Sequence, residues 1–536
     1  MAPAGVGASV EPDSALHAYA QARMADSDGA LAKAVDYYRA ALKLDPARME
    51  IARRSYVQGI ESGDGALALR SAVMLEQAGQ LPRDGTLLRL GDALARKDWA
   101  DAKAMSVRMV GEENFAFLAP IVSSWISLGE GAYAPPVVDG KNRFSALAQR
   151  YVDEHIAYEA LGRRDLTVAV PAIRRAIAAR EDDAATMRLG FAAQLAAQGA
   201  KAEALMLLPV NDARFAVARA AIEKGKAQRL RALTPAQGYA VLLARMASDI
   251  ASSDGGRVLS IRLARIATFA DPQSAEARIV AAELLTDSGL PSAGAVEARM
   301  VPVDGWYGVL AQAELVDAMA AGGDRDGALT LARTLADAPG ADPQRHVRLG
   351  QLLGERKDYA GAAAAFKAAQ ALYPEGKAPW PLLLFEGSAL EQGKRWDEAR
   401  VVLERAVAMA PNEPAILNYL GYMQVERRQN VAAALDLIKK ASALKPQDAA
   451  ITDSLGWAQF VTGDVTGAVP VLERAAASAP VDATINEHLG DALWTAGRRY
   501  EARYAWKAAA VFAQGDIAAR LAAKTKQGLK PEYAAP

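Results

Sequence analysis

The chain has few residues whose types could do chemistry, and their spacing does not assemble a site. Its four histidines, His17, His155, His346 and His488, are far apart, and none stands in the His-Glu-x-x-His spacing of a zinc site. The chain has no cysteine, which excludes thiolate nucleophiles, thiolate metal ligands and disulfides. The glycine–lysine pairs at 140–141, 225–226 and 376–377 lack the other residues of a phosphate-binding loop. We therefore predict that the protein is not an enzyme and has no metal site and no cofactor.

A second group of residues has the chemistry of a binding surface. These residues lie three before, one after or four after a glycine, and such positions share one helix face at 3.6 residues per turn. Exposed tryptophan and tyrosine dominate the energetics of protein interfaces, so this face is a candidate partner-binding surface. The alternative is that its aromatic side chains belong to the core. The members of the group are Asn418, Tyr422, Asp453, Trp457, Phe460, Glu487, Asp491 and Trp494.

The elements that position these residues recur with a regular period. Glycines at 350, 387, 421, 456 and 490 are spaced 37, 34, 35 and 34 residues apart. Each is followed at a near-constant distance by an alanine, a bulky apolar residue and a second alanine, and a proline closes four of the five units. Small residues suit points where two helices cross, and proline suits the turn between units. We expect the bulky residue to fill the gap between neighbouring units.

This pattern resembles the tetratricopeptide repeat (TPR), a helix–turn–helix unit of about 34 residues. The resemblance implies an all-α fold, a right-handed superhelical solenoid in which the first helix of each pair lines the concave face. The eight residues would then lie in a concave groove. Their acids have the wrong sign for the basic clamp with which chaperone-binding members hold a C-terminal carboxylate. A basic or neutral peptide or protein segment with apolar anchors fits this face better.

The period also predicts the organisation of the chain. Residues 343–516 are expected to form five well-formed TPR repeats, and residues 517–536 a capping helix and a C-terminal tail. Residues 13–342 are expected to form degenerate TPR-like repeats, and residues 1–12 a flexible N-terminal tail. Glycine- and proline-rich stretches predict loops near 129–143, 251–257 and 300–308 that interrupt the degenerate repeats.

The amino-acid composition restricts the class of partner and the cellular compartment that we expect. Lysine and arginine number 62 against 63 acids, a balance that argues against nucleic-acid binding. No apolar run reaches the roughly 20 residues of a membrane span. The first residues, "MAPAGVGASVEPDSA", look like what remains after a signal peptide is removed. We therefore expect the periplasm or cell envelope, with the cytoplasm as the alternative.

The order of landmarks is similar to that of exported alphaproteobacterial TPR proteins of unassigned activity. The stretches that carry this resemblance are "YAQARMADSDGALAKAVDYYRAALKLDP", "LAPIVSSWISLGEG" and, most specifically, "DSLGWAQFVTGDVTGAVPVLERA". The predicted function is a non-catalytic scaffold or assembly factor that binds an extended peptide or protein segment on its concave face. The alternative is a solenoid that binds a small molecule or glycan near the central loops.

Overall fold

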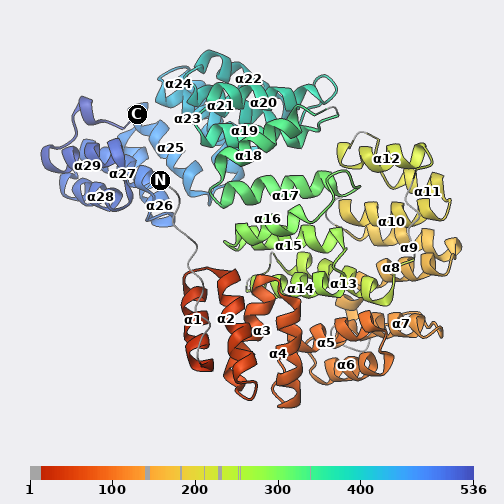
Figure 1. Cartoon of the computed structure of the whole chain (residues 1–536). Helices are drawn as coiled ribbons and strands as arrows, with labels where there is room; N and C mark the ends of the chain where they lie inside the picture. Colours follow the sequence, from red (N-terminus) through yellow and green to blue (C-terminus); the bar gives the residue numbers. More distant parts are fainter. Residues whose placement is uncertain are drawn as a thin grey trace, which may run out of the picture. The chain divides into compact units, whose positions relative to one another are not determined.

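Every regular element in the described part of the chain is a helix. The computed structural model describes residues 14–138, 145–180, 184–210, 212–226, 232–251, 253, 255–338 and 340–535. These residues form 29 α-helices and three short 3-10 helices, with no strand among them, which confirms the all-α solenoid. The chain divides into two compact units, Met1–Asp342 and Pro343–Pro536, whose helices are labelled in Figure 1. The predicted tail at 1–12 lies outside the described residues.

The C-terminal unit is a series of helix pairs in which each helix packs against its partner, and the first helices of neighbouring pairs also touch, as in α23–α25 and α25–α27. Its helices are α19 (Pro343–Glu355), α20 (Tyr359–Ala371), α21 (Trp380–Gln392), α22 (Trp396–Met409), α23 (Pro414–Glu426), α24 (Val431–Leu444), α25 (Ala449–Val461), α26 (Val465–Ser478), α27 (Ala483–Thr495), α28 (Arg499–Phe512) and α29 (Gly515–Gln527), followed by the 3-10 turn Pro531–Tyr533.

Each of these pairs crosses at its glycine. A Cβ atom at Gly456 would lie 2.6 Å from Leu472 Cγ, and one at Gly490 would lie 2.3 Å from Trp506 Nε1. The bulky residue of the second helix therefore packs onto the glycine of its own repeat, a contact that the sequence analysis placed between neighbouring units. The five pairs are Gly350–Phe366, Gly387–Leu403, Gly421–Ile438, Gly456–Leu472 and Gly490–Trp506.

The N-terminal unit contains α1 to α18 and two short 3-10 helices, Ala116–Leu118 and Ala213–Phe215. Its helices are α1 (Ala15–Ser27), α2 (Leu31–Leu44), α3 (Met49–Ser62), α4 (Gly65–Gln77), α5 (Arg83–Arg96), α6 (Trp99–Gly111), α7 (Ala119–Gly129), α8 (Ser145–Gly162), α9 (Leu166–Ala178), α10 (Ala185–Ala197), α11 (Lys201–Met206), α12 (Ala216–Glu223), α13 (Pro235–Ile250), α14 (Arg257–Ala270), α15 (Ala275–Asp287), α16 (Pro291–Arg299), α17 (Gly308–Ala321) and α18 (Arg325–Ala336).

Three connections in this unit fall where loops are predicted. Residues 130–144 separate α7 from α8, residues 251–256 separate α13 from α14, and residues 300–307 separate α16 from α17. Positions 139–144, 252 and 254 lie outside the described residues. Within the described part of the chain, no helix combines the length and the apolarity needed to cross a membrane.

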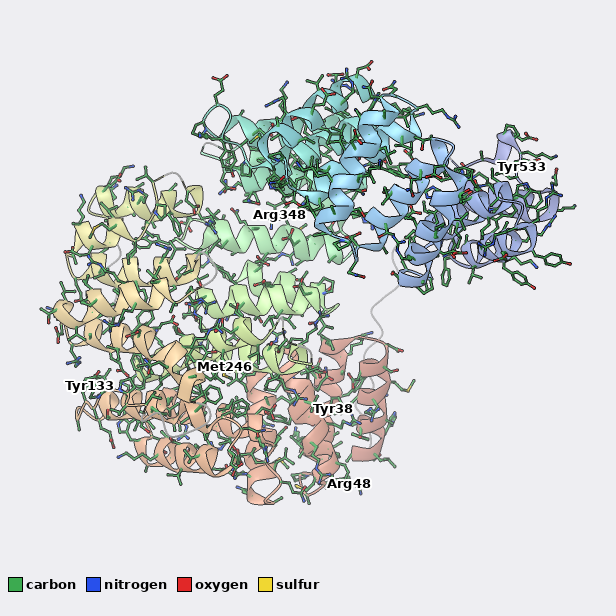
Figure 2. The ribbon with its side chains drawn as sticks, turned by 180° about the vertical axis from the view of Figure 1, so that it is seen from behind. Tyr38, Arg48, Tyr133, Met246, Arg348 and Tyr533 are labelled. Carbon is green, nitrogen blue, oxygen red and sulfur yellow. The ribbon has the colours of Figure 1, made fainter. Side chains whose placement is uncertain are left out.

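The N-terminal unit differs from a simple array because its later helices return to its earlier ones. Helices α13 and α14 pack against α5, and they also contact α7 and α3 respectively. The Tyr239 hydroxyl of α13 donates to the carbonyl oxygen of Leu87 in α5 at 3.1 Å. Met246 of the same helix is buried in the interior of the unit (Figure 2). Contacts between distant segments therefore close this unit, in addition to contacts between neighbours.

Buried ion pairs also join helices that are far apart in the sequence. Arg245 of α13 donates to both carboxylate oxygens of Glu154 in α8, at 3.1 and 3.2 Å, and also to Glu276 in α15. Arg265 of α14 pairs with Glu297 and donates to the carbonyl oxygen of Glu61 at 3.2 Å. All five charged side chains of these pairs are buried, so removing one partner would leave the other charge buried without a counter-ion.

Candidate functional site

The eight predicted binding residues lie on three first helices of the C-terminal unit: Asn418 and Tyr422 on α23, Asp453, Trp457 and Phe460 on α25, and Glu487, Asp491 and Trp494 on α27. We call this surface the α23–α25–α27 face. His488 of α27 joins the three helices. Its ring stacks on Trp457 with centroids 4.1 Å apart, lies 6.3 Å from the Tyr422 ring, and places Nδ1 2.9 Å from Asp453 Oδ2.

The expectation that these side chains lie open in a groove is wrong for four of them. Trp457 is 2% exposed and Asp491 is 0% exposed, and Asp453 and Glu487 are also buried. Tyr422, Phe460, Trp494 and Asn418 are partly buried. The cause is that other parts of the same unit cover the face. Partner binding by these residues stays a prediction.

The first cover is helix α29. Arg520 donates to both carboxylate oxygens of Glu487 at 2.7 Å, a two-pronged geometry that favours arginine. The Lys524 ammonium is 0% exposed and lies 2.6 Å from Glu487 and 2.7 Å from Asp491. The two bases, four residues apart on α29, thus match two acids that are four residues apart on α27.

The second cover is the C-terminal segment, residues 528–535. A Cβ atom at Gly528 would lie 2.2 Å from Trp494 Cζ2, so this backbone lies directly on the indole. At the other end of the segment, the Ala535 N–H donates to Asp491 Oδ2 at 3.1 Å. The Ala535 side chain packs in the same apolar cluster as Trp457. The face therefore holds a short stretch of chain, which includes the 3-10 turn Pro531–Tyr533, by one backbone hydrogen bond and by apolar contacts.

The charges on this face are matched by opposite charges. Burial alone would raise the pKa of Glu487, but hydrogen bonds from Arg520 and Lys524 hold it below its usual value. Burial opposes protonation of His488, yet the adjacent Asp453 raises its pKa above the ordinary value. Glu487 has two cations within hydrogen-bond distance and Asp453 is bonded by the His488 ring, so the face offers little unpaired charge to a ligand while α29 stays in place.

Sequence reasoning missed α29 and the C-terminal segment as partners of this face. The signal for α29 was present, because Arg520 and Lys524 repeat the four-residue spacing of Glu487 and Asp491. Opposite charges at matching intervals on two helices predict that the helices can pair face to face. The contact of Ala535 with Asp491 uses a backbone N–H, which leaves no trace in a residue pattern.

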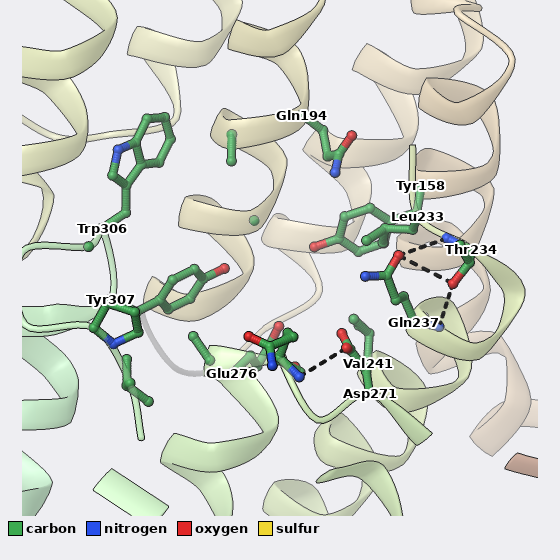
Figure 3. A pocket seen from close by; sticks show the side chains of 18 of the residues that line it. Tyr158, Gln194, Leu233, Thr234, Gln237, Val241, Asp271, Glu276, Trp306 and Tyr307 are labelled. Carbon is green, nitrogen blue, oxygen red and sulfur yellow. Dashed lines mark hydrogen bonds between the residues drawn. The ribbon is translucent and has the colours of Figure 1, made fainter. Parts of the chain in front are cut away.

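A cavity of about 670 Å³ lies in the N-terminal unit, where α8, α10, α13 and α15 meet the connection at 300–307 (Figure 3). Its aromatic lining comes from Tyr158, Trp306 and Tyr307. A Cβ atom at Gly190 would lie 2.5 Å from the Tyr158 hydroxyl and 3.3 Å from the Tyr307 hydroxyl. The two tyrosine hydroxyls therefore converge at a position that only glycine leaves open. Sequence reasoning placed a possible pocket near the central loops but did not identify these rings.

Neither candidate site has the residues of a metal centre. Within the ranges that the structure describes, no three histidine or acidic side chains lie close enough together to hold a metal ion. His155 is buried, accepts a hydrogen bond from Trp125 Nε1 at 3.0 Å, and burial lowers its pKa to about 3, so it is a neutral core residue.

Comparison with known proteins identifies the repeat. A family model described as tetratricopeptide repeat matches residues 386–449 and 454–521. The TPR repeat-containing protein PA4667 of Pseudomonas aeruginosa is 38% identical over 88 residues, which cover 16% of this chain and only 15% of that protein.

Solved structures of similar proteins cover about a third of the chain. A crystal structure of MamA is 20% identical, covers 31% of this chain and 94% of that chain, and has a TM-score of 0.28. YrrB, described as a TPR protein with an unusual peptide-binding site, is 17% identical, covers 37% and 97%, and has a TM-score of 0.29. MamA from Desulfovibrio magneticus RS-1 is 18% identical, covers 33% and 97%, and has a TM-score of 0.29. Taken with the helix pairs and their glycine crossings, the family match identifies residues 386–449 and 454–521 as tetratricopeptide repeats.

Proposed function

We propose that the protein is a non-catalytic scaffold or assembly factor whose C-terminal unit binds an extended peptide segment on the α23–α25–α27 face. The observation that carries the proposal is that the C-terminal segment of the chain itself already lies there. Its backbone contacts Trp494 at Gly528 and donates to Asp491 at Ala535. A partner segment of similar chemistry would make the same contacts in its place.

The same contacts define the partner that the face prefers. Because α29 already neutralises Glu487 and Asp491, a segment that replaces only residues 528–535 gains little from a positive charge. It needs a free backbone N–H for Asp491, a small residue on the Trp494 ring, and an apolar side chain beside Trp457. Of the predicted partner classes, a neutral segment with apolar anchors therefore fits better than a basic one.

The test uses the segment as a free peptide. A chain that ends at Gln527 keeps α29 and exposes the site, so it should bind a fluorescent peptide of residues 528–535 in an anisotropy titration. The full chain should bind the same peptide at least about tenfold more weakly, because a tethered competitor acts at a roughly millimolar effective concentration. Equal binding by both chains, or none by a truncated chain with unchanged circular dichroism, would contradict the proposal.

Peptide variants provide controls that leave the protein unchanged. Replacing Ala535 by glutamate puts a carboxylate beside Asp491, so Ala535→Glu should abolish binding of the peptide. Lys530 is exposed, so Lys530→Ala should change the affinity little. Affinity that falls steeply with salt would indicate that α29 is displaced as well, which would restore the basic partner as the preferred class.

The cavity of the N-terminal unit favours a second candidate function, binding of a small molecule or a glycan. Its volume of about 670 Å³ lies within the range of roughly 300–1,000 Å³ that is common for small-molecule sites. The two candidates use different units of the chain, so a ligand in the cavity would not by itself exclude a peptide on the α23–α25–α27 face.

We also propose that the protein resides in the periplasm or cell envelope. The absence of cysteine is compatible with an oxidising compartment, and the similarity to exported TPR proteins supports the same location. Fractionation of the native cell, with detection by antibody, tests this proposal. Recovery in the cytosolic fraction alone would contradict it.

A further inference from the structure

The cavity of the N-terminal unit has fixed walls. The Tyr158 ring packs on Phe191 with centroids 4.5 Å apart, and the Tyr307 hydroxyl donates to the Thr186 carbonyl oxygen at 3.3 Å. Glu276, at the base of the cavity, is held from behind by Arg245 and by the Thr186 hydroxyl, which donates to it at 2.8 Å. Side chains that are already fixed lose little entropy when a ligand binds.

The polar part of the lining mixes donors and acceptors. Gln237 closes a capping box with Thr234, in which its Oε1 accepts the Thr234 N–H at 3.0 Å (Figure 3). Asp271 accepts the Gln273 N–H at 3.1 Å and is partly exposed to the cavity. Gln194 adds another amide from α10. A ligand hydroxyl needs such a mixture because it both donates and accepts, whereas an ammonium group needs acceptors alone.

The charge of the lining excludes one ligand class. Asp271, Glu276 and Asp304 carry carboxylates, and none of the described residues that line the cavity is a lysine or an arginine. The positive charge of Arg245 lies behind the wall, where Glu154 and Glu276 share it. A phosphate, sulfate or carboxylate ligand would therefore meet like charges, with no lysine or arginine among the described lining residues to pair with.

From this combination we infer that the cavity binds an uncharged, polyhydroxylated ring, the chemistry of a neutral sugar or short oligosaccharide. The inference rests on the second candidate function and specifies its ligand. Trp306 and the two tyrosines supply flat apolar faces for the C–H side of a sugar ring, while the amides and carboxylates bond its hydroxyls. Trp306 stands on the connection at 300–307 across the cavity from Gln237, so a ring between them contacts both kinds of wall (Figure 3).

Saturation-transfer difference NMR on the full chain tests this inference. The probes are maltose, cellobiose and N,N′-diacetylchitobiose as neutral sugars, glucosamine as a cation and glucuronate as an anion. We expect transfer to at least one neutral disaccharide, and a loss of at least fivefold in the Trp306→Ala variant. Trp306→Phe keeps an aromatic face and should retain most of the transfer. Trp396→Ala, which removes a partly exposed tryptophan from the C-terminal unit, is the matched control and should leave the transfer unchanged.

The outcomes separate the ligand class from the site. Transfer that depends on Trp306 but occurs only with glucosamine or glucuronate would overturn the neutral-sugar assignment and retain a small-molecule site. Transfer to none of the probes at millimolar concentration would overturn both. Circular dichroism of Trp306→Ala that matches the wild type ensures that a loss of signal reports on the cavity and not on unfolding.

Discussion

The C-terminal unit is held by contacts between sequence neighbours, whereas the N-terminal unit also depends on contacts between residues far apart. In the C-terminal unit each glycine receives the bulky side chain of its own repeat, such as Leu472 on Gly456. In the N-terminal unit Arg245 joins α8 to α15 and Arg265 joins α14 to α3. Where the repeat pattern is regular, local packing suffices. Where the repeat pattern is degenerate, buried ion pairs and contacts between distant helices add to the local packing.

The largest effect expected is from breaking the buried charge network of the N-terminal unit. Arg245→Ala leaves Glu154 and Glu276 buried without their cation, which should cost about 3–5 kcal/mol. Hydrogen exchange measured by mass spectrometry should show the loss of protection in the N-terminal unit alone. The control Arg395→Ala removes a solvent-exposed pair with Glu398 and should leave the stability nearly unchanged. Equal losses would contradict the contrast between the units.

In the C-terminal unit, Trp457→Ala tests whether the α23–α25–α27 face is part of the core. The ring stacks between His488 and Phe460 and is 2% exposed, so its removal should cost about 3–5 kcal/mol. Hydrogen exchange should accelerate in α25 and α27, with the N-terminal unit unaffected. Unchanged protection together with weaker binding of the 528–535 peptide would restore the original expectation of an open groove.

A smaller, pH-dependent effect should appear in the N-terminal unit. Burial raises the pKa of Glu159 to about 7, so the folded state prefers the protonated carboxyl. Stability is therefore full below the unfolded value near 4.5 and is lost as the pH rises through 7, by at most about 3 kcal/mol. Glu159→Gln removes this titration.

Melting curves of the wild type and the glutamine variant provide the measurement. The difference in stability between Glu159→Gln and the wild type should shift in favour of the variant as the pH rises from 4.5 to 8. A difference between the two proteins that stays constant from pH 4.5 to pH 8 would show that Glu159 does not titrate in this range.

The smallest effects are expected from two glycines of helix α19, one at a helix crossing and one away from it. A Cβ at Gly350 would lie 2.7 Å from the Phe366 ring, so Gly350→Ala should cost about 1–3 kcal/mol. A Cβ at Gly354 meets nothing within 4 Å, so Gly354→Ala should stabilise the helix by roughly 0.5–1 kcal/mol. Urea titrations followed by circular dichroism measure both. A loss of similar size for both variants would mean that the crossing distance does not decide the cost.

The repeats of the C-terminal unit can be predicted from the sequence because the residues that specify each helix crossing lie within one repeat. The spacing of Gly456, Leu472 and Ala475 specifies one helix crossing without reference to the rest of the chain. The helix face that carries Trp457 and Asp491 follows from the same spacing. What covers that face does not follow from the repeat spacing, because α29 and residues 528–535 lie beyond the last repeat.

The N-terminal unit was less predictable for the opposite reason. The partners of Arg245 lie 91 and 31 residues away, and no periodic pattern connects such positions. The aromatic residues of the cavity come from α8 and from the connection at 300–307, and only their folding onto Gly190 brings them together.

The bond from Arg265 to the carbonyl oxygen of Glu61 spans 204 residues and has a consequence for biosynthesis. At translation rates of about 5–20 residues per second, helix α3 emerges on the order of 10–40 seconds before α14 exists. During that interval the surface that α14 later covers has no intramolecular cover, while each C-terminal repeat meets its neighbour within a few seconds of synthesis. The N-terminal unit is therefore where a nascent chain of this protein would most need a holding chaperone.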